Sequence, residues 1–401
     1  MTVTQPVLHE ADRIKRLPRY LFTIMDELKA KAVAQGQDVI DLGMGNPDLP
    51  SPPHAVEELC RQAAKVENQR YSRPNGDVEQ AFKRAVAQWY QGRFGVTIDP
   101  LTEVLPLIGS KEGIAHLSLA FMNPDDVAIV PSPAYPPHGD SVIMAGGTVH
   151  TVPLSAEAGY VLDLAAIPES VLSRAKILFV SYPHNPTSAC VDLGFYERLV
   201  AWAKGRSLIV CSDLAYSDLV FDGYKAPSLL QANGVRDMYG IEFHTVSKSY
   251  NMAGWRVGFA VGHPNVLRVL EKTKSYIDFG NFRAVQLAAI QALIGPQDCV
   301  HHTVEIYRKR RDVFVEHMRQ AGWPVPSPKG TFYVWAKIPD RFRALSSLDF
   351  ASRLVEQAGV VVAPGIGFGD LGNGCVRFSL VQPEDRLRQA AQRLGKVLAA
   401  T

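Results

Sequence analysis

The sequence predicts an α/β protein, in which a mostly parallel seven-stranded sheet is covered by helices and followed by a smaller α+β domain. Two observations carry this prediction. Short apolar runs alternate with amphipathic helical stretches through the first two thirds of the chain, as in parallel sheets. After about residue 285 the alternation stops, and a long charged helix precedes isolated strands and further helices.

The expected elements follow from local periodicity and from bounding turn residues. Seven strands are expected at 104–108, 127–130, 147–152, 176–181, 207–211, 241–246 and 256–261. Helical patterns lie between most of them, such as 112–120, 134–145 and 193–204. In the last part we expect helices at 298–321, 348–358 and 382–398, with strands at 331–338 and 376–380.

Composition limits the functional classes. The 401 residues carry a formal net charge of only +2, which gives no reason to expect nucleic acid or an anionic membrane as a partner. No apolar run approaches the roughly 20 residues that span a bilayer. No signal peptide is visible at the N-terminus. The five cysteines are scattered without a CxxC or Cys/His cluster, so we expect no metal, no disulfide framework and a reducing, cytoplasmic setting.

Lys248 stands in Ser-Lys-Ser directly after the apolar run 241–246, and Arg256 follows eight positions later. A lone lysine at a strand end is usually a surface residue. Two neighbouring cations, however, favour an anion between them. A phosphorylated aldehyde cofactor meets that need, because the arginine can bind its phosphate and the lysine amine can condense with its carbonyl.

Three further strand ends carry polar residues that suit the same cofactor. Asp213 ends an apolar run and could pair with a protonated pyridine nitrogen, and Tyr216 follows it. Asn185 lies between two prolines in the loop after 176–181. Ser110 and Lys111 follow Gly109 at a helix start, where backbone N–H groups favour a phosphate. Taken singly, these residues are also explained as helix caps or turns.

Together these motifs resemble the class I aminotransferases of the fold type I pyridoxal-phosphate enzymes, over nearly the whole chain. The resemblance implies pyridoxal 5'-phosphate as cofactor and three catalytic residues: Lys248 as the Schiff-base lysine, Asp213 as the partner of the pyridine nitrogen, and Tyr216. It implies that the other cofactor-binding residues are Asn185 and Tyr216 at the ring oxygen, Ser110, Lys111, Ser247 and Arg256 at the phosphate, Tyr135 stacked on the ring, and Tyr71 reaching the neighbouring subunit's phosphate.

The resemblance also implies the substrate contacts and the assembly. Arg377 would bind the substrate α-carboxylate together with Asn185, and Gly45 lies in a mobile substrate-facing segment. We expect a homodimer with shared active sites. The expected segments are 1–50, which joins the small domain, 51–289, which is the large cofactor-binding domain, and 290–401, which is the small C-terminal domain.

Several stretches resemble the bacterial glutamate–pyruvate (alanine) aminotransferase branch, so we expect alanine and 2-oxoglutarate as substrates. Aspartate or LL-diaminopimelate is the alternative. A pyridoxal-phosphate C–S lyase or a non-catalytic regulatory module remains as a further class. Two departures from the family pattern bear on substrate choice, namely the stretch 76–84 and Arg283, whose charge could recruit an acidic substrate.

Overall fold

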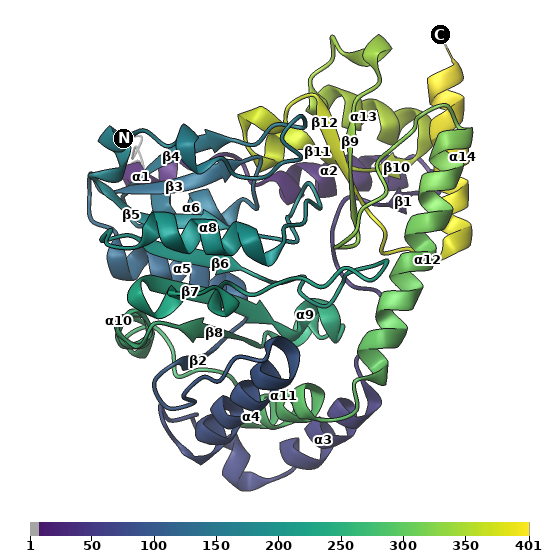
Figure 1. Cartoon of the computed structure of the whole chain (residues 1–401). Helices are drawn as coiled ribbons and strands as arrows, with labels where there is room; N and C mark the ends of the chain where they lie inside the picture. The colour runs from purple at the N-terminus through teal and green to yellow at the C-terminus, as the bar shows by residue number, and fades with distance from the viewer. Residues whose placement is uncertain (1–7, 401) are drawn as a thin grey trace, which may run out of the picture.

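The computed structural model describes residues 8–400, and a seven-stranded sheet forms its centre (Figure 1). The strand order is β2-β8-β7-β6-β5-β3-β4. The strands are β2 (Val104–Leu107), β3 (Val127–Ser132), β4 (Thr148–Pro153), β5 (Ala175–Val180), β6 (Ile209–Asp213), β7 (Tyr239–Thr245) and β8 (Gly258–Gly262). β8 is antiparallel to both neighbours, and the other pairs are parallel. The predicted mostly parallel seven-stranded sheet is confirmed.

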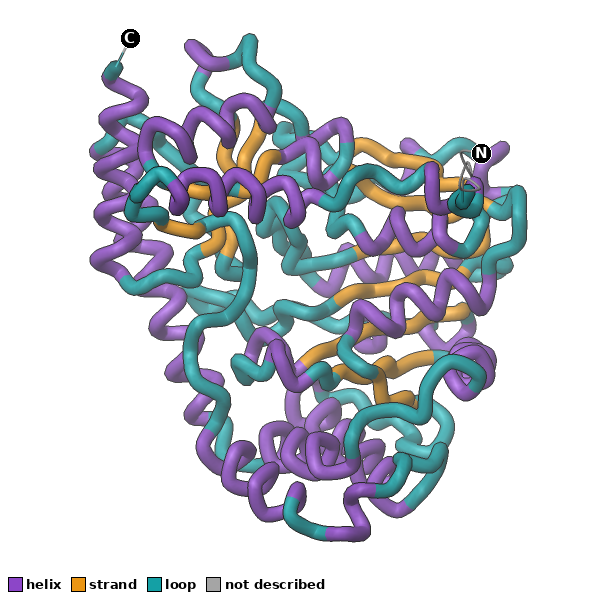
Figure 2. The backbone as a smooth tube through the Cα atoms, turned by 180° about the vertical axis from the view of Figure 1, so that it is seen from behind, coloured by secondary structure: helices purple, strands orange, loops and turns teal. Residues whose placement is uncertain are grey.

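Helices bury both faces of this sheet. Ile177 and Phe179 of β5 pack in one apolar cluster with α5 (Ser110–Phe121), α6 (Pro137–Met144) and α10 (Pro264–Ser275). The alternate residues Leu178 and Val180 pack in a second cluster with α8 (Leu193–Ala203). α8 lies in front of the sheet in Figure 1, and Figure 2 shows helices across the other face. Because both faces of the sheet are covered, successive residues of its strands are apolar, which explains the continuous apolar runs in the sequence.

Three helices pack together beyond the β2 edge of the sheet. They are α3 (Pro53–Ala63), α4 (Asp77–Phe94) and α11 (Arg283–Ile294), and α11 contacts both of the others. Their apolar residues share a cluster with β2 and β8. The first turns of α4 and α11 follow the loops that carry Tyr71 and Asn281, so this packing brings the two loops together.

The C-terminal part is built on a three-stranded antiparallel sheet of order β11 (Ala363–Pro364), β12 (Cys375–Ser379) and β9 (Tyr333–Lys337). β1 (Ile40–Asp41) pairs in parallel with β10 (Val360–Val361), and α2 (Leu21–Ala34) packs on α13 (Ser347–Ala358). N-terminal residues therefore return to the C-terminal part. The boundaries at 50 and 289 stay predictions, and residues 1–7 lie outside the described part.

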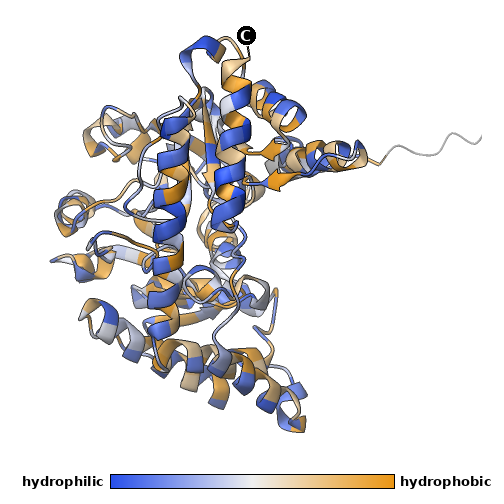
Figure 3. Ribbon diagram, turned by 90° about the vertical axis from the view of Figure 1, so that its right-hand side faces the viewer, coloured by the Kyte–Doolittle hydropathy of each residue, from blue (hydrophilic) through white to orange (hydrophobic). Residues whose placement is uncertain are grey.

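Two long helices cover this small sheet. α12 (Asp298–Gln320) and α14 (Glu384–Ala399) lie side by side, and Figure 3 shows many hydrophilic residues on the faces turned to the viewer. Their inner faces bury Phe314, Met318, Leu387 and Leu394 in one cluster with the sheet. Short helices complete the fold: α1 (Asp12–Lys15), α7 (Glu169–Leu172) and α9 (Val246–Ser249). Among residues 8–400, no helix is long and apolar enough to cross a membrane.

Several predicted boundaries were wrong by two or three residues, and three of them bear directly on the site. The strand expected from 256 begins at 258, because Arg256 adopts a left-handed conformation (φ 57°) that interrupts extended backbone. The helix expected from 134 begins at Pro137, which leaves Tyr135 in a loop. The strand expected from 331 begins at Tyr333, because Thr331 has a φ of 64°.

Candidate active site

The carboxyl ends of the sheet strands open onto a cavity of about 230 Å³. Its walls come from segments that are distant in the sequence, including the N-terminal segment, the sheet and the C-terminal part. It is lined by Met44, Gly45, Ser110, Lys111, Tyr135, Asn185, Asp213, Tyr216, Thr245, Ser247, Lys248, Arg256, Tyr333, Phe368 and Arg377, among others. Every predicted site residue except Tyr71 lines this cavity.

Lys248 enters the cavity from α9, the short helix that follows β7. Its Nζ donates a hydrogen bond to the carbonyl oxygen of Gly45 at 2.8 Å. Desolvation of the ammonium, and then the positive charges of Arg377 and Arg256, lower the pKa of Lys248 to about 7. A substantial fraction of this amine is therefore neutral at physiological pH, as a nucleophile or proton acceptor requires.

Asp213 ends β6 and has one satisfied and one open oxygen. Its Oδ2 lies 3.1 Å from Nε2 of His138, which stacks on Phe179 with ring centroids 5.2 Å apart. Its Oδ1 is buried without a hydrogen-bond partner. An open buried acceptor is costly unless a ligand fills it. His138 was missed from the sequence, although its position three residues after Tyr135 in the same segment was a usable signal.

The far side of the cavity is an anion cradle at the N-terminus of α5. Gly109 precedes the helix with a φ of 77°, and a Cβ there would collide with the guanidinium of Arg256. Gly258 allows β8 to approach the backbone N–H of Ser110, which a Cβ would meet at 2.7 Å. The N-terminal turn of α5, Ser247 and Arg256 therefore line one region of the cavity, and a helix N-terminus beside a guanidinium suits a phosphate.

Arg377 lies on β12 and is only 1% exposed. Its guanidinium donates to Oδ1 of Asn185 at 2.7 Å and to the carbonyl of Gly43 at 3.0 Å, and its carbon lies 4.0 Å from the ring centroid of Tyr333. Its Nε is buried without a partner. A fixed guanidinium with an unused donor can bind a carboxylate.

Two tyrosines meet beside Lys248. The hydroxyl groups of Tyr216 and Tyr333 are 2.8 Å apart, and burial raises the pKa of Tyr216 well above its usual value, so its phenol stays protonated. A Cβ on Gly45 would collide with the Tyr333 ring, so the absence of a side chain there lets the Gly45 carbonyl reach Lys248. Tyr333 was not predicted as a site residue, because a tyrosine in a strand is usually interpreted as part of the hydrophobic core.

Tyr71 and Arg283 lie outside the cavity. Tyr71 is 77% exposed, and its ring centroid lies 5.0 Å from that of Phe279. Arg283 donates to both carboxylate oxygens of Asp77, at 2.9 and 3.1 Å. Asp77 belongs to the stretch 76–84, so the two departures from the family pattern form an ion pair and neutralise each other's charge. This pairing argues against the expectation that Arg283 recruits an acidic substrate.

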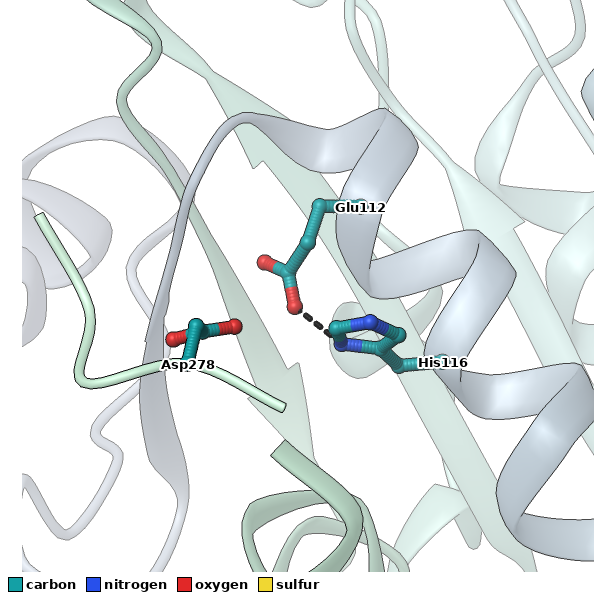
Figure 4. A group of neighbouring side chains, drawn as sticks. All are labelled: Glu112, His116 and Asp278. Carbon is teal, nitrogen blue, oxygen red and sulfur yellow. Dashed lines mark ion pairs between the residues drawn. The ribbon is translucent and has the colours of Figure 1, made fainter. Parts of the chain in front are cut away.

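A second polar cluster lies at the start of α5, where Glu112, His116 and Asp278 face one another (Figure 4). These are potential metal ligands. The ammonium of Lys274 lies 2.8 Å from Asp278 and 3.3 Å from Glu112, however. Lys274 therefore already supplies positive charge to the two carboxylates, and the cluster is explained as an ion-pair network.

The chain matches the family model for class I and II aminotransferases over residues 37–394. It is 46% identical over 391 residues to an LL-diaminopimelate aminotransferase of Moorella thermoacetica, covering 98% of this chain and 99% of the relative. It is also 46% identical to the Escherichia coli glutamate-pyruvate aminotransferase AlaC, covering 97% and 93%. The Bacillus subtilis BacF structure in its substrate-bound form superposes with a TM-score of 0.92 at 37% identity, covering 98% of both chains.

The cavity fits the cofactor of that family. The open oxygen of Asp213 suits a protonated ring nitrogen, the cradle at α5 suits a phosphate, and the Lys248 amine suits an aldehyde. LL-diaminopimelate aminotransferases recur among the relatives. The chain belongs to the class I and II aminotransferases and is a pyridoxal-phosphate-dependent enzyme of fold type I.

Proposed function

We propose that this aminotransferase moves the α-amino group of LL-diaminopimelate to a 2-oxo acid such as 2-oxoglutarate. Sequence identity does not separate this substrate from alanine, because the relatives of both kinds are 46% identical to the chain. The observation that carries the preference is a second cavity beside the first. Alanine, whose side chain is a methyl group, has no use for additional space of this kind.

The second cavity has a volume of about 450 Å³ and shares Tyr135, Pro136 and Phe368 with the first. Arg19, Asp140 and Asp370 bring charge to its walls, which are otherwise largely apolar, and Arg19 also pairs with Glu27. Burial raises the pKa of Asp140, and Lys111 opposes that shift. The distal end of LL-diaminopimelate carries an ammonium and a carboxylate. We assign the ammonium to Asp140 and the carboxylate to Arg19.

Pyridoxal phosphate, when bound, supplies a ring that withdraws electrons from the substrate Cα. We assign the open oxygen of Asp213 to the ring nitrogen and Lys248 to the aldehyde carbon. The remaining assignments are Asn185 and Tyr216 for the ring oxygen, Tyr135 for stacking, and Ser110, Lys111, Ser247 and Arg256 for the phosphate.

In the reaction the Lys248 amine moves the proton of the substrate Cα, which requires its neutral form. Arg377, held by Asn185, binds and orients the α-carboxylate of both the donor and the acceptor, since both carry that group. The Tyr216 phenol is a protonated hydrogen-bond donor beside Lys248. The Gly45 segment lies over the Lys248 amine.

A panel of amino donors tests the substrate. LL-diaminopimelate, alanine and aspartate are compared by kcat/KM with 2-oxoglutarate and with pyruvate as acceptors. We expect LL-diaminopimelate to exceed alanine by tenfold or more. If alanine ranks first, the alanine interpretation replaces this one. Release of a 2-oxo acid without any acceptor would instead indicate a lyase.

The second cavity is tested by Asp140→Asn. We expect kcat/KM for LL-diaminopimelate to fall about tenfold or more, as for a lost charged hydrogen bond, with alanine transamination unchanged. Asp26→Asn is the control, because it makes the same charge change at an exposed site. An equal fall for both substrates would contradict a role in binding the distal group.

We further propose a homodimer in which Tyr71 completes the partner's phosphate site. In support, Tyr71 lies outside its own cavity, is exposed and packs on Phe279, whose segment also exposes Tyr276, Ile277 and Phe282. Mixing inactive Lys248→Ala subunits with inactive Tyr71→Ala subunits should recover activity, because a hybrid dimer holds one site with neither change. A monomer that is active at every dilution contradicts this.

We also propose a cytoplasmic location. All five cysteines are free thiols in the structure, which suits a reducing compartment. Cell fractionation checks this location.

A further inference from the structure

A buried glutamine joins two loops at the start of α11. Gln286 is 2% exposed, and its side-chain amide donates to the Ser72 hydroxyl at 2.9 Å and to the Asn281 carbonyl at 3.0 Å. Ser72 follows Tyr71 directly in the chain. One amide group thus ties the loop that carries Tyr71 to the loop that precedes α11.

The connection continues to the phosphate cradle. The side-chain amide of Asn281, itself buried, donates to the backbone carbonyl of Arg256. Arg256 adopts the left-handed conformation, which costs free energy for a residue other than glycine and persists only where neighbours hold it. The bond from Asn281 is one such constraint. An unbroken chain of contacts therefore runs from Tyr71 through Ser72, Gln286 and Asn281 to Arg256.

Other contacts hold the same two loops from outside. The Tyr71 ring packs on Phe279, and Arg283 at the start of α11 pairs with Asp77 at the start of α4. The fully buried Gln286 has a cost, because its Oε1 has no partner. An apolar side chain of similar shape would avoid that cost. We therefore infer that the glutamine is useful here because its two donated hydrogen bonds position the two loops.

We propose that Gln286 is a positioning residue that locks two phosphate-binding groups into one unit, Arg256 for its own active site and Tyr71 for the partner's site. The proposal rests on the shared-site dimer of the proposed function. Each subunit would then present both groups at a fixed relative position, and the two cofactor sites of the dimer would depend on the same hydrogen-bond network.

Gln286→Leu tests whether Gln286 supports cofactor binding, because leucine keeps the approximate shape of the side chain and removes both donated hydrogen bonds. Cofactor is titrated into cofactor-free protein and its binding is followed by absorbance. We expect the dissociation constant to rise about tenfold, which is about 1.4 kcal/mol. At saturating cofactor, kcat should stay within about twofold, since Gln286 touches no reacting atom. Gln291→Leu is the control, because it makes the same change on the same helix outside the network.

A merely structural role predicts a different result. The unfolding temperature of the cofactor-free Gln286→Leu protein would then fall while its cofactor affinity stayed normal, and that outcome overturns the proposal. Ser72→Ala provides a second route to the same contact. Since Ser72 and Gln286 share one bond, their effects on cofactor affinity should be clearly less than additive in the double variant, and full additivity also counts against the network.

Hybrid dimers separate the two sites. Subunits with different affinity tags are combined so that one carries Lys248→Ala and only the other can turn over. Gln286→Leu is placed either on the active subunit, where it disturbs that site's own Arg256, or on the inactive subunit, where it disturbs the donated Tyr71. We expect both placements to raise the cofactor concentration needed for half-maximal activity.

An effect from only one placement, or from neither, overturns the claim that one network serves two sites. Failure of the shared-site dimer has a separate signature, because mixed Lys248→Ala and Tyr71→Ala subunits then recover no activity. The affinity measurement on the Gln286→Leu homodimer is independent of that result.

Discussion

Two neighbouring strands of the large sheet each hold a buried carboxylate against a histidine, yet the two pairs differ in what remains open. Glu242 of β7 is fully satisfied. Its Oε1 accepts from Tyr90 at 2.7 Å and faces His244 at 2.9 Å, while its Oε2 accepts from Ser212 at 3.2 Å and from the backbone of Leu229 at 2.9 Å.

Asp213 of β6 faces His138 through one oxygen only, and its other oxygen is buried without a partner. Glu242 is buried even more deeply. Burial works to raise the Glu242 pKa, but the hydrogen bonds from His244, Tyr90 and Leu229 outweigh it, and the pKa lies below its ordinary value. Depth of burial therefore does not distinguish the two carboxylates, whereas an open acceptor on a residue that lines the cavity does.

Lys248→Ala should have the largest effect on the functional side of this comparison. In the proposed function the amine both bonds the cofactor and moves the substrate proton, so kcat should fall by about 10⁴ or more. The Glu242 network is untouched, so circular dichroism and the unfolding temperature should stay near those of the parent protein. Near-normal transamination by this variant, measured with any donor, would refute the assigned site.

Asp213→Asn separates the open carboxylate from its neighbour. Loss of the charge beside the ring nitrogen weakens the electron sink, and kcat should fall by roughly 10²–10³. An N-methylated cofactor analogue, which is permanently cationic, should restore part of the rate. If the analogue restores nothing, the carboxylate acts through structure, as Glu242 does.

Glu242→Gln is the matched change at the closed carboxylate. It leaves His244 without its charged partner in a fully buried network, so the free energy of unfolding should fall by about 3 kcal/mol. Activity per folded molecule should stay within about twofold. Chemical denaturation and active-site titration measure the two quantities. A variant that keeps its stability but loses turnover would reverse the roles assigned to the two carboxylates.

The smallest effect is a shift in titration at Lys248. Its pKa of about 7 means that the amine is charged below that pH and neutral above it, whereas an exposed lysine stays charged until about 10.5. In cofactor-free protein, acylation of Lys248 measured by mass spectrometry should rise with pH through a midpoint near 7. A midpoint near 10.5, the ordinary value for a lysine, would contradict the lowered pKa.

The sequence by itself determined the sheet and placed most candidate site residues at the ends of its strands. Lys248, Asp213 and Asn185 each follow an apolar run, and a strand followed by a polar residue is a local pattern that survives in any parallel sheet. Because the carboxyl ends of such strands meet at one edge, residues separated by long stretches of chain could be placed together before any contact was known.

Only the tertiary structure decided which partners satisfy those residues. The contact of His138 with Asp213, the Tyr333 hydroxyl beside Tyr216 and the pairing of Arg283 with Asp77 join segments from different elements. No local pattern encodes them, because a hydrogen bond depends on distances of a few tenths of an ångström, which are set by packing between elements. That one oxygen of Asp213 has no hydrogen-bond partner could be established only from the positions of all its neighbours.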